Sequence, residues 1–452
     1  MEGNLTKGPI LKTLTKLAVP IMASSFLGTL YNITDMAWIG LLGSKAVAGV
    51  GVGGMFTWLS QGLAAMARMG GQVHVAQCIG RGDRERAHGF AQAAVQLAAF
   101  MGMAYAILSL LFTRQMVGFF QLADAQAHAA AMSYTRIACG LIVFSFMTLT
   151  LTGLYTAQGD SKTPFIANLV GLVTNMVLDP VLILGAGMFP KLGVVGAAIA
   201  TVTAQAIVMS IMIVGIVIQK KENVLKGIRL TAKIPKEYLG GLCRIGIPTA
   251  IQGMAYCAIS MVLTRFVAVW GDAAVAVQRV GSQIESISWM TADGFAASIN
   301  SFAGQNFGGK RYDRVQKGYF VAAACMFVWG TFCSFLLIFG AQPIFRLFIQ
   351  ETDVIPMGVQ YLTVLGLSQM FMCIESMTVG ALSGIGKTFL SSIISISLTS
   401  ARVPLAFLLQ RTPLGLNGVW WALSLTSVAK GIIFFIVYLK VLKNLTQRGE
   451  TN

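Results

Sequence analysis

The chain has 452 residues and a formal net charge of +16, yet only 11% of its residues are charged and 56% are hydrophobic. A soluble domain carries roughly 25% charged residues, so this composition excludes an ordinary soluble protein and indicates a membrane protein. The positive charge does not indicate a nucleic-acid-binding domain, because the basic residues lie in short segments between apolar stretches and leave no large extramembrane domain.

Apolar stretches follow one another along the chain, separated by charged residues and turn formers. Each is long enough for a membrane span, which needs about 20 mostly apolar residues. The pattern predicts an all-α membrane protein with twelve transmembrane helices, near residues 15–40, 47–78, 89–112, 133–157, 164–187, 193–219, 240–269, 275–305, 317–341, 358–384, 389–410 and 415–441.

Basic residues gather in the loops on one side of these spans. With an even number of spans, both termini lie on that same side, and the positive-inside rule places it in the cytoplasm. The N-terminal residues have no short apolar core followed by a cleavage site, so they lead into the first span. We therefore expect a multi-pass protein of the plasma membrane, a bacterial inner or cell membrane, with few basic residues outside: Lys45, Arg114, Lys191, Arg346 and Arg411.

The two halves of the chain resemble each other. LAVPIMASSFL resembles IGIPTAIQGMA, with Pro20 matching Pro248. At the same offset of 228 residues, GSKAVA resembles GDAAVA and QCIGRGDRERA resembles QNFGGKRYDRV. Six spans per half give two parallel repeats around a central cavity, an arrangement typical of secondary transporters that work by alternating access. The predicted parts are an N-lobe (1–218, helices 1–6), a basic cytoplasmic linker (219–236) and a C-lobe (237–452, helices 7–12).

TNMVLDPVLILG, residues 174–185, places a carboxylate inside an apolar span. Asp179 is costly there unless a partner or an ion neutralises it. Asn175 lies four residues earlier, on the same helix face. Pro180 removes a backbone hydrogen bond and favours a bend. An acid, an amide and a weakened helix together favour a cation site on a span that can bend.

The chain resembles the multidrug and toxic compound extrusion (MATE) family, closest to its DinF-like branch, within the superfamily of multidrug, oligosaccharidyl-lipid and polysaccharide exporters. The resemblance covers essentially the whole chain. It implies a secondary antiporter that exports amphipathic, often cationic organic compounds in exchange for protons or sodium. It rests on six motifs: YNITDMAWIG (31–40), GQVHVAQCIGRGDRERA (71–87), TAQGDSKTPF (156–165), TNMVLDPVLILG (174–185), GVVGAAIAT (193–201) and AGQNFGGKRYDRV (303–315).

The family's coupling residues lie in the N-lobe. An acid of span 1 corresponds to Asp35, and an Asn–Asp pair of span 5 corresponds to Asn175 and Asp179. Thr201 is the nearest match to a threonine of span 6 that assists in some members. The resemblance therefore implies a coupling site for a proton, or for sodium held by Asp35, Asn175 and Asp179, and no other cofactor.

Three further acids lie within the predicted spans of the C-lobe: Glu285, Asp293 and Glu375. They could attract cationic substrates into the cavity or form a second coupling site. Another branch of the family uses acids in spans 7 and 10, but span 7 has no matching carboxylate here. The alternative is that these acids form salt bridges with the intramembrane residues Arg265, Arg279 or Arg402. We interpret Arg68, Arg136 and Lys430 as gate or counter-charge residues, and the alternative is that they snorkel or form structural pairs.

Two other functions remain open at this point. The first is a flippase of the same superfamily, for lipid-linked oligosaccharides or other lipids. The second, from a different class, is a membrane enzyme or a non-transporting receptor; the chain lacks a GxxxxGK[ST] loop and any catalytic constellation, so we do not expect an enzyme. The expected partners are small organic substrates and membrane lipid, without nucleic acid, and the expected state is a monomer.

Overall fold

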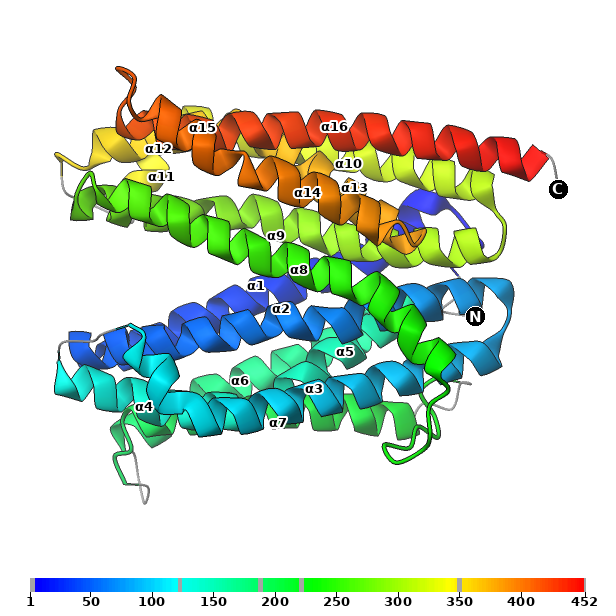
Figure 1. Cartoon of the computed structure of the whole chain (residues 1–452), viewed down its shortest axis with the longest axis horizontal. Coiled ribbons are helices and arrows are strands. Elements are labelled where there is room, and N and C mark those ends of the chain that lie inside the picture. Colours follow the sequence, from blue (N-terminus) through cyan, green and yellow to red (C-terminus); the bar gives the residue numbers. More distant parts are fainter. Residues whose placement is uncertain (1–4, 121–123, 186–189, 219–222, 348–351, 451–452) are drawn as a thin grey trace. The chain divides into compact units, whose positions relative to one another are not determined.

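The computed structural model describes residues 5–120, 124–185, 190–218, 223–347 and 352–450, which form helices and short connections (Figure 1). The prediction of an all-α protein is confirmed for these residues. The helices are α1 (Ile10–Gly40), α2 (Ser44–Arg81), α3 (Arg84–Gly118), α4 (Ala125–Gly140), α5 (Val143–Ala157), α6 (Lys162–Leu184), α7 (Val194–Ile218), α8 (Lys236–Ala268), α9 (Asp272–Gly308), α10 (Tyr312–Phe339), α11 (Ala341–Arg346), α12 (Ile355–Gly366), α13 (Gln369–Gly384), α14 (Thr388–Ser400), α15 (Arg402–Leu409) and α16 (Leu416–Glu450).

Length and hydropathy identify eight candidate membrane spans in the described part of the chain, or up to ten if each of two bent helix pairs is one span. The bent pairs are α4 with α5, at 47°, and α12 with α13, at 48°. The predicted spans 47–78 and 275–305 correspond to α2 and α9. These two helices have 38 and 37 residues, long enough to cross a bilayer, although they are not among the eight candidates.

The backbone repeats as the sequence does. Gly43 before α2 and Gly271 before α9 have φ angles of 101° and 102°. At the ends of the same two helices, Gly82 and Lys310 have φ angles of 82° and 56°. This left-handed region favours glycine, so Lys310 adopts it against its own preference because the turn of the repeat requires it. The two bent pairs also occupy corresponding places in the halves.

The chain forms two compact units, and the first and second halves of α1 and of α8 belong to different units. The first unit contains Ala23–Ala250, and the second contains Leu5–Met22 together with the residues from Ile251 onward. Both divisions fall two residues after a matching proline, Pro20 in α1 and Pro248 in α8. The lobe boundaries at 218 and 237 stay a prediction; the packing divides α1 and α8 within their length.

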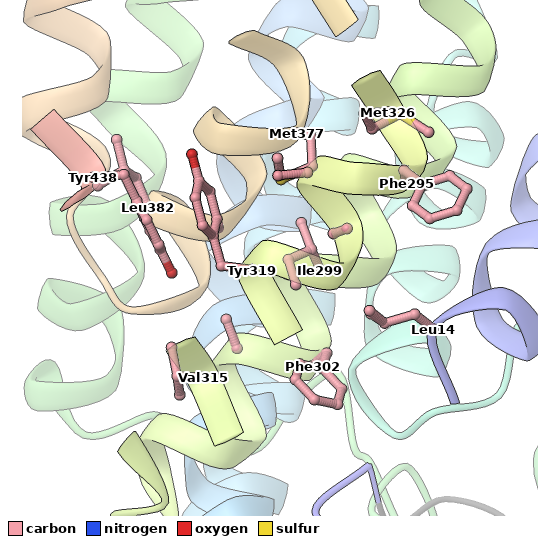
Figure 2. Close-up of a cluster of buried hydrophobic side chains, with 14 of the residues drawn as sticks. Leu14, Phe295, Ile299, Phe302, Val315, Tyr319, Met326, Met377, Leu382 and Tyr438 are labelled. Atoms are coloured by element: carbon pink, nitrogen blue, oxygen red, sulfur yellow. The ribbon is translucent and has the colours of Figure 1, made fainter. Parts of the chain in front are cut away.

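Apolar clusters hold each unit together. In the second unit, Tyr319 of α10 stacks on Tyr438 of α16 with ring centroids 3.9 Å apart, and its hydroxyl lies 2.9 Å from that of Thr378 on α13. Leu14, from the first half of α1, belongs to the same cluster, near Phe302 of α9 (Figure 2). The cluster therefore fixes the start of α1 to the second unit.

Hydrogen bonds anchor the basic linker that the sequence predicts between the two lobes. Of the linker 219–236, residues 219–222 lie outside the described residues. The described remainder is held by α3 of the first unit: His88 Nδ1 lies 2.8 Å from the carbonyl oxygen of Val224, and Gln96 Nε2 donates to the carbonyls of Arg229 and Ala232. The linker is thus packed against the first unit.

Candidate functional site

The middle of α6 contains a buried acid and amide. Asn175 and Asp179 are one turn apart and both fully buried. Asn175 Nδ2 donates to Asp179 Oδ1 over 3.2 Å. This bond fixes the amide so that Asn175 Oδ1 and Asp179 Oδ2 face elsewhere, and both oxygens are buried without a hydrogen-bond partner. Helix α6 continues through Pro180, which cannot donate to the carbonyl of Met176.

Helix α1 brings a second carboxylate to this place. Asp35 is 7% exposed, and its charge interacts with that of Asp179. Its Oδ1 is buried and has no hydrogen-bond partner. Tyr31 lies one turn earlier on the same helix, near both acids, and its hydroxyl is also buried without a partner. Two buried carboxyl groups from different helices are therefore close enough for their charges to interact.

Helix α7 completes the site because it approaches α6 closely. A Cβ on Gly196 would lie 2.4 Å from the carbonyl oxygen of Leu182, so only glycine permits this crossing. Thr201, further along α7, consequently lies next to Tyr31, and its hydroxyl is buried without a partner. Tyr134 of α4 also approaches Thr201 and the two acids.

The structure therefore brings all four predicted N-lobe residues into one site. Sequence reasoning missed the two tyrosines. Tyr31 could have been found, since it lies four residues before Asp35 and so shares its helix face. Tyr134 carries no such signal, because only the packing of α4 against α2 and α7 places it here.

These side chains leave buried oxygens that have no hydrogen-bond partner in the described part of the chain. An unsatisfied buried polar group costs about 1–3 kcal/mol, and two nearby carboxylates repel each other in addition. A proton would remove the repulsion and supply a donor, whereas sodium would take the oxygens as hard ligands. Either cation fits the oxygens present: Asp35 Oδ1, Asp179 Oδ2, Asn175 Oδ1, Thr201 Oγ1 and the Tyr31 hydroxyl.

The walls of this site are apolar. Ile39 of α1, Ile183 of α6 and Ala197 of α7 are fully buried and belong to one hydrophobic cluster. Tyr134 joins the same cluster through its ring. Because these apolar side chains cannot stabilise a charge, the acids depend on the polar groups of the site or on an ion.

The three acids of the predicted C-lobe lie in different surroundings. Glu285 on α9 is partly buried; its Oε1 has no partner, and Tyr361 of α12 lies against it. Asp293, two turns along α9, is exposed. Glu375 on α13 is buried and bonded to Lys430. The salt-bridge alternative thus holds for Glu375, but with Lys430 rather than with one of the three arginines considered.

The chain carries the sequence pattern of one family twice. The MatE family pattern matches residues 20–181 and again residues 248–408, so each half is matched from the same repeat position onward. The chain belongs to the MatE family. Members of this family are membrane transporters, which makes this chain a multi-pass transporter and not an enzyme.

MatE relatives match over nearly their whole length. The chain is 29% identical over 420 residues to "Probable multidrug resistance protein NorM" of Thermotoga maritima, covering 91% of this chain and 88% of the relative. It is 26% identical to "Probable multidrug resistance protein YoeA" of Bacillus subtilis, covering 92% and 90%. A crystal structure of "MATE in the bent conformation" superposes with a TM-score of 0.90, at 25% identity and 100% and 99% coverage. The twelve-helix, two-lobe fold of MATE transporters is therefore the fold of this chain.

Proposed function

We propose that this MatE transporter exports amphipathic, often cationic organic compounds in exchange for protons or sodium. The observation that carries the proposal is the group of unpartnered buried oxygens around Asp35 and Asp179. Relatives named as multidrug resistance proteins support the class of substrate. The predicted setting is a bacterial cell membrane with both termini in the cytoplasm, and the working unit is a monomer.

Cation binding at this site changes its internal hydrogen bonds. With both carboxylates charged, Asp35 and Asp179 repel each other across α1 and α6. A proton or a sodium ion between them removes that repulsion and competes with Asn175 for Asp179 Oδ1. Pro180 follows directly and leaves the α6 backbone one hydrogen bond short, so the turn most affected is also the least constrained. We infer that the cation acts on α6 at this turn during alternating access.

Two acids of the second unit supply charge for a cationic substrate. Glu285 has an unpartnered buried oxygen, and Asp293 is exposed on the same helix. A positively charged compound entering beside α9 would find both carboxylates within about two helical turns. This assigns substrate attraction to Glu285 and Asp293, and ion coupling to Asp35, Asn175, Asp179 and Thr201.

A fluorescent organic cation in vesicles containing the purified protein tests this function. Export is measured under an imposed proton gradient and under an imposed sodium gradient. We expect one gradient to drive export and Asp179→Asn to abolish it, because an amide cannot exchange a proton or neutralise sodium. Asp353→Asn removes an exposed acid of the α11–α12 connection and serves as the matched control, with export unchanged.

Three outcomes distinguish the alternatives. Export that continues normally in a folded Asp179→Asn variant contradicts the coupling site. Export by wild type under neither gradient contradicts antiport of organic cations. In that case the movement of lipid-linked oligosaccharides between the two leaflets is measured in the same vesicles. Such movement would show that the protein is a flippase.

A further inference from the structure

Helices α13 and α16 of the second unit share a buried ion pair. Lys430 Nζ lies 2.6 Å from Glu375 Oε1, and the two residues are only 5% and 9% exposed. Isolated charges are very costly at such depth, and a pair is tolerated only when its geometry is good. The short contact and the direct packing of α13 on α16 meet that condition. Glu375 is therefore neutralised by the protein itself.

A second buried cation, Arg402 of α15, binds to the same face of α16 one turn before Lys430. Arg402 Nε donates to Thr426 Oγ1 and its Nη2 donates to Ser427 Oγ, each over 2.9 Å. Thr426 and Ser427 precede Lys430 by four and three residues, so they share its helix face. Arg402 is 7% exposed, and its charge interacts with that of Lys430. The local potential around Glu375 is thus made more positive, which disfavours any additional cation.

The remaining titratable groups around the pair do not change this balance. On α9, the carboxylate of Glu285 interacts with the charge of Arg402, and Tyr361 on α12 lies against Glu285. Helix α14 has no titratable side chain. The described helices around the pair also carry phenols, thiols, one exposed acid and one arginine: Tyr319, Cys325 and Cys333 on α10, Cys373 on α13, Tyr438 on α16, and Asp293 and Arg279 on α9. Further charged groups lie in the first turns of α10 (Asp313, Arg314, Lys317) and in the later turns of α16 (Lys440, Lys443).

The two units therefore treat a buried acid in opposite ways. In the first unit, Asp35 Oδ1 and Asp179 Oδ2 are left without partners. In the second unit, Glu375 is paired with the ammonium group of Lys430, which is covalently held by the side chain of that residue. The chain is duplicated, so each unit had the scaffold for such a site; Asp35 and Asp179 stay open to an exchangeable cation, whereas Glu375 is occupied by Lys430.

We propose that Lys430 is a tethered counter-cation that occupies a latent cation site at Glu375. Glu375 consequently binds no coupling ion, and it adds nothing to the ion stoichiometry set by the site between Asp35 and Asp179. This inference rests on the proposed antiport function. It also makes a statement that needs no transport: removing the ammonium group should open Glu375 to a proton or to sodium.

Thermal unfolding of the purified protein tests this statement apart from transport. All variants are made in an Asp35→Asn/Asp179→Asn background, which removes both carboxylates of the first site. The unfolding midpoint is measured as a function of NaCl concentration, with choline chloride keeping the ionic strength constant, and separately as a function of pH. Adding Lys430→Gln should make the midpoint rise with sodium or with falling pH by about 3 °C or more, since an unpaired buried carboxylate is stabilised by either cation. Further addition of Glu375→Gln should remove that dependence.

Lys440→Gln is the matched control, because it removes an exposed lysine from the same helix. It should leave the response to sodium and pH as in the background. The proposal is overturned if Lys430→Gln and Lys440→Gln respond alike. It is equally overturned if the response of Lys430→Gln persists after Glu375→Gln. Neither comparison depends on export, so a failure of the proposed function would be seen separately in the vesicle assay.

A second variant decides the case if Lys430→Gln does not fold. Glu375→Gln/Lys430→Gln, in an otherwise natural chain, replaces the ion pair by two amides that can hydrogen-bond, which is often tolerated. Ion-driven export should keep the same ion dependence as in wild type, within roughly twofold. Loss of that dependence in the folded double variant would show that Glu375 itself binds a coupling ion, and would overturn the proposal.

Discussion

Thr201 is an uncharged member of the candidate cation site, and valine can replace it with nearly the same shape. Its hydroxyl is buried and unpartnered beside Tyr31. Thr201→Val keeps the shape of the side chain but removes one oxygen ligand. The loss should be about 1.4 kcal/mol, which corresponds to a roughly tenfold higher ion concentration for half-maximal export. The measurement is export rate against proton or sodium concentration.

Thr201→Ser keeps the hydroxyl and should stay close to wild type. Thr174→Val, on α6, serves as a control for the substitution itself, because the Thr174 hydroxyl already donates to the carbonyl of Val170. Equal ion dependence in Thr201→Val and wild type would remove Thr201 from the site and leave Asp35, Asn175 and Asp179 as its members.

Asp124, outside the spans, gives a pH dependence whose sign can be stated. Its side chain pairs with Lys45 Nζ at 2.8 Å and caps α4 by accepting from the amides of Gln126 and Ala127. The hydrogen bond to Lys45, together with the amides, holds the pKa of Asp124 below its usual value. The stabilisation is therefore fully present above the unfolded-state pKa of about 3.9, and is lost as pH falls through the lower folded-state pKa.

Asp124→Ala should accordingly lower the unfolding midpoint at neutral pH, and the difference from wild type should shrink below about pH 4. Scanning calorimetry or fluorescence at a series of pH values measures it. Asp353→Ala, which removes an acid without a helix cap, should show no such pH-dependent difference. A difference for Asp124→Ala that is constant down to strongly acidic pH would contradict the role of its charge.

At the scale of helices, the crossing of α6 and α7 positions the cation site. The Cβ of Gly196→Ala would meet the α6 backbone at Leu182, which cannot move aside like a side chain. The helices must separate, at a cost of about 1–3 kcal/mol, and Thr201 moves away from Asp179. We expect ion affinity in the export assay to fall more than the unfolding midpoint does.

Gly54→Ala in α2 is the matched control, since a Cβ there meets no atom within 4 Å. It should be neutral or slightly stabilising, because alanine favours helix over glycine by about 1 kcal/mol. If Gly196→Ala were as harmless as Gly54→Ala, the close crossing would not be what places Thr201 in the site.

The helices themselves were predictable, because the sequence contains apolar stretches long enough to span a bilayer and repeats its motifs in the same order in both halves. The placement of Asp35 beside Asp179 was available only through the family resemblance, since the two lie on separate helices. The pair of Glu375 and Lys430 was not predictable: several cations in the same half could have served, and the choice depends on how α13 and α16 are rotated about their axes. Tyr134 was missed for the same reason.

At the scale of the whole molecule, the division of α1 and α8 between two units is the feature that sequence patterns did not reveal. Each helix is one continuous apolar stretch, so composition cannot show that its two ends pack in different units. The repeated proline gave the only hint, at Pro20 and Pro248. Each of these two helices therefore belongs to both units, and the strength of its anchoring in each unit matters.

The start of α1 is anchored by polar contacts as well as by its apolar face. Arg311 Nη1 donates to the carbonyl of Thr6 over 2.7 Å, and Arg314 Nη2 donates to the carbonyls of Lys7 and Gly8 over 3.0 and 2.7 Å. We expect Arg311→Gln/Arg314→Gln to loosen residues 10–18 of α1. Each 1.4 kcal/mol lost from local opening speeds amide exchange about tenfold, so hydrogen-exchange mass spectrometry of this segment measures the effect directly.

Arg346→Gln is the control, because Arg346 is an exposed arginine at the end of α11. Its variant should leave exchange in residues 10–18 unchanged. If exchange in the double variant is faster in α1 but unchanged in α8, the arginines act on α1 specifically. If exchange is faster everywhere, the second unit as a whole is destabilised. Unchanged exchange would mean that the two arginines do not stabilise the start of α1, and that the apolar cluster around Leu14 anchors it instead.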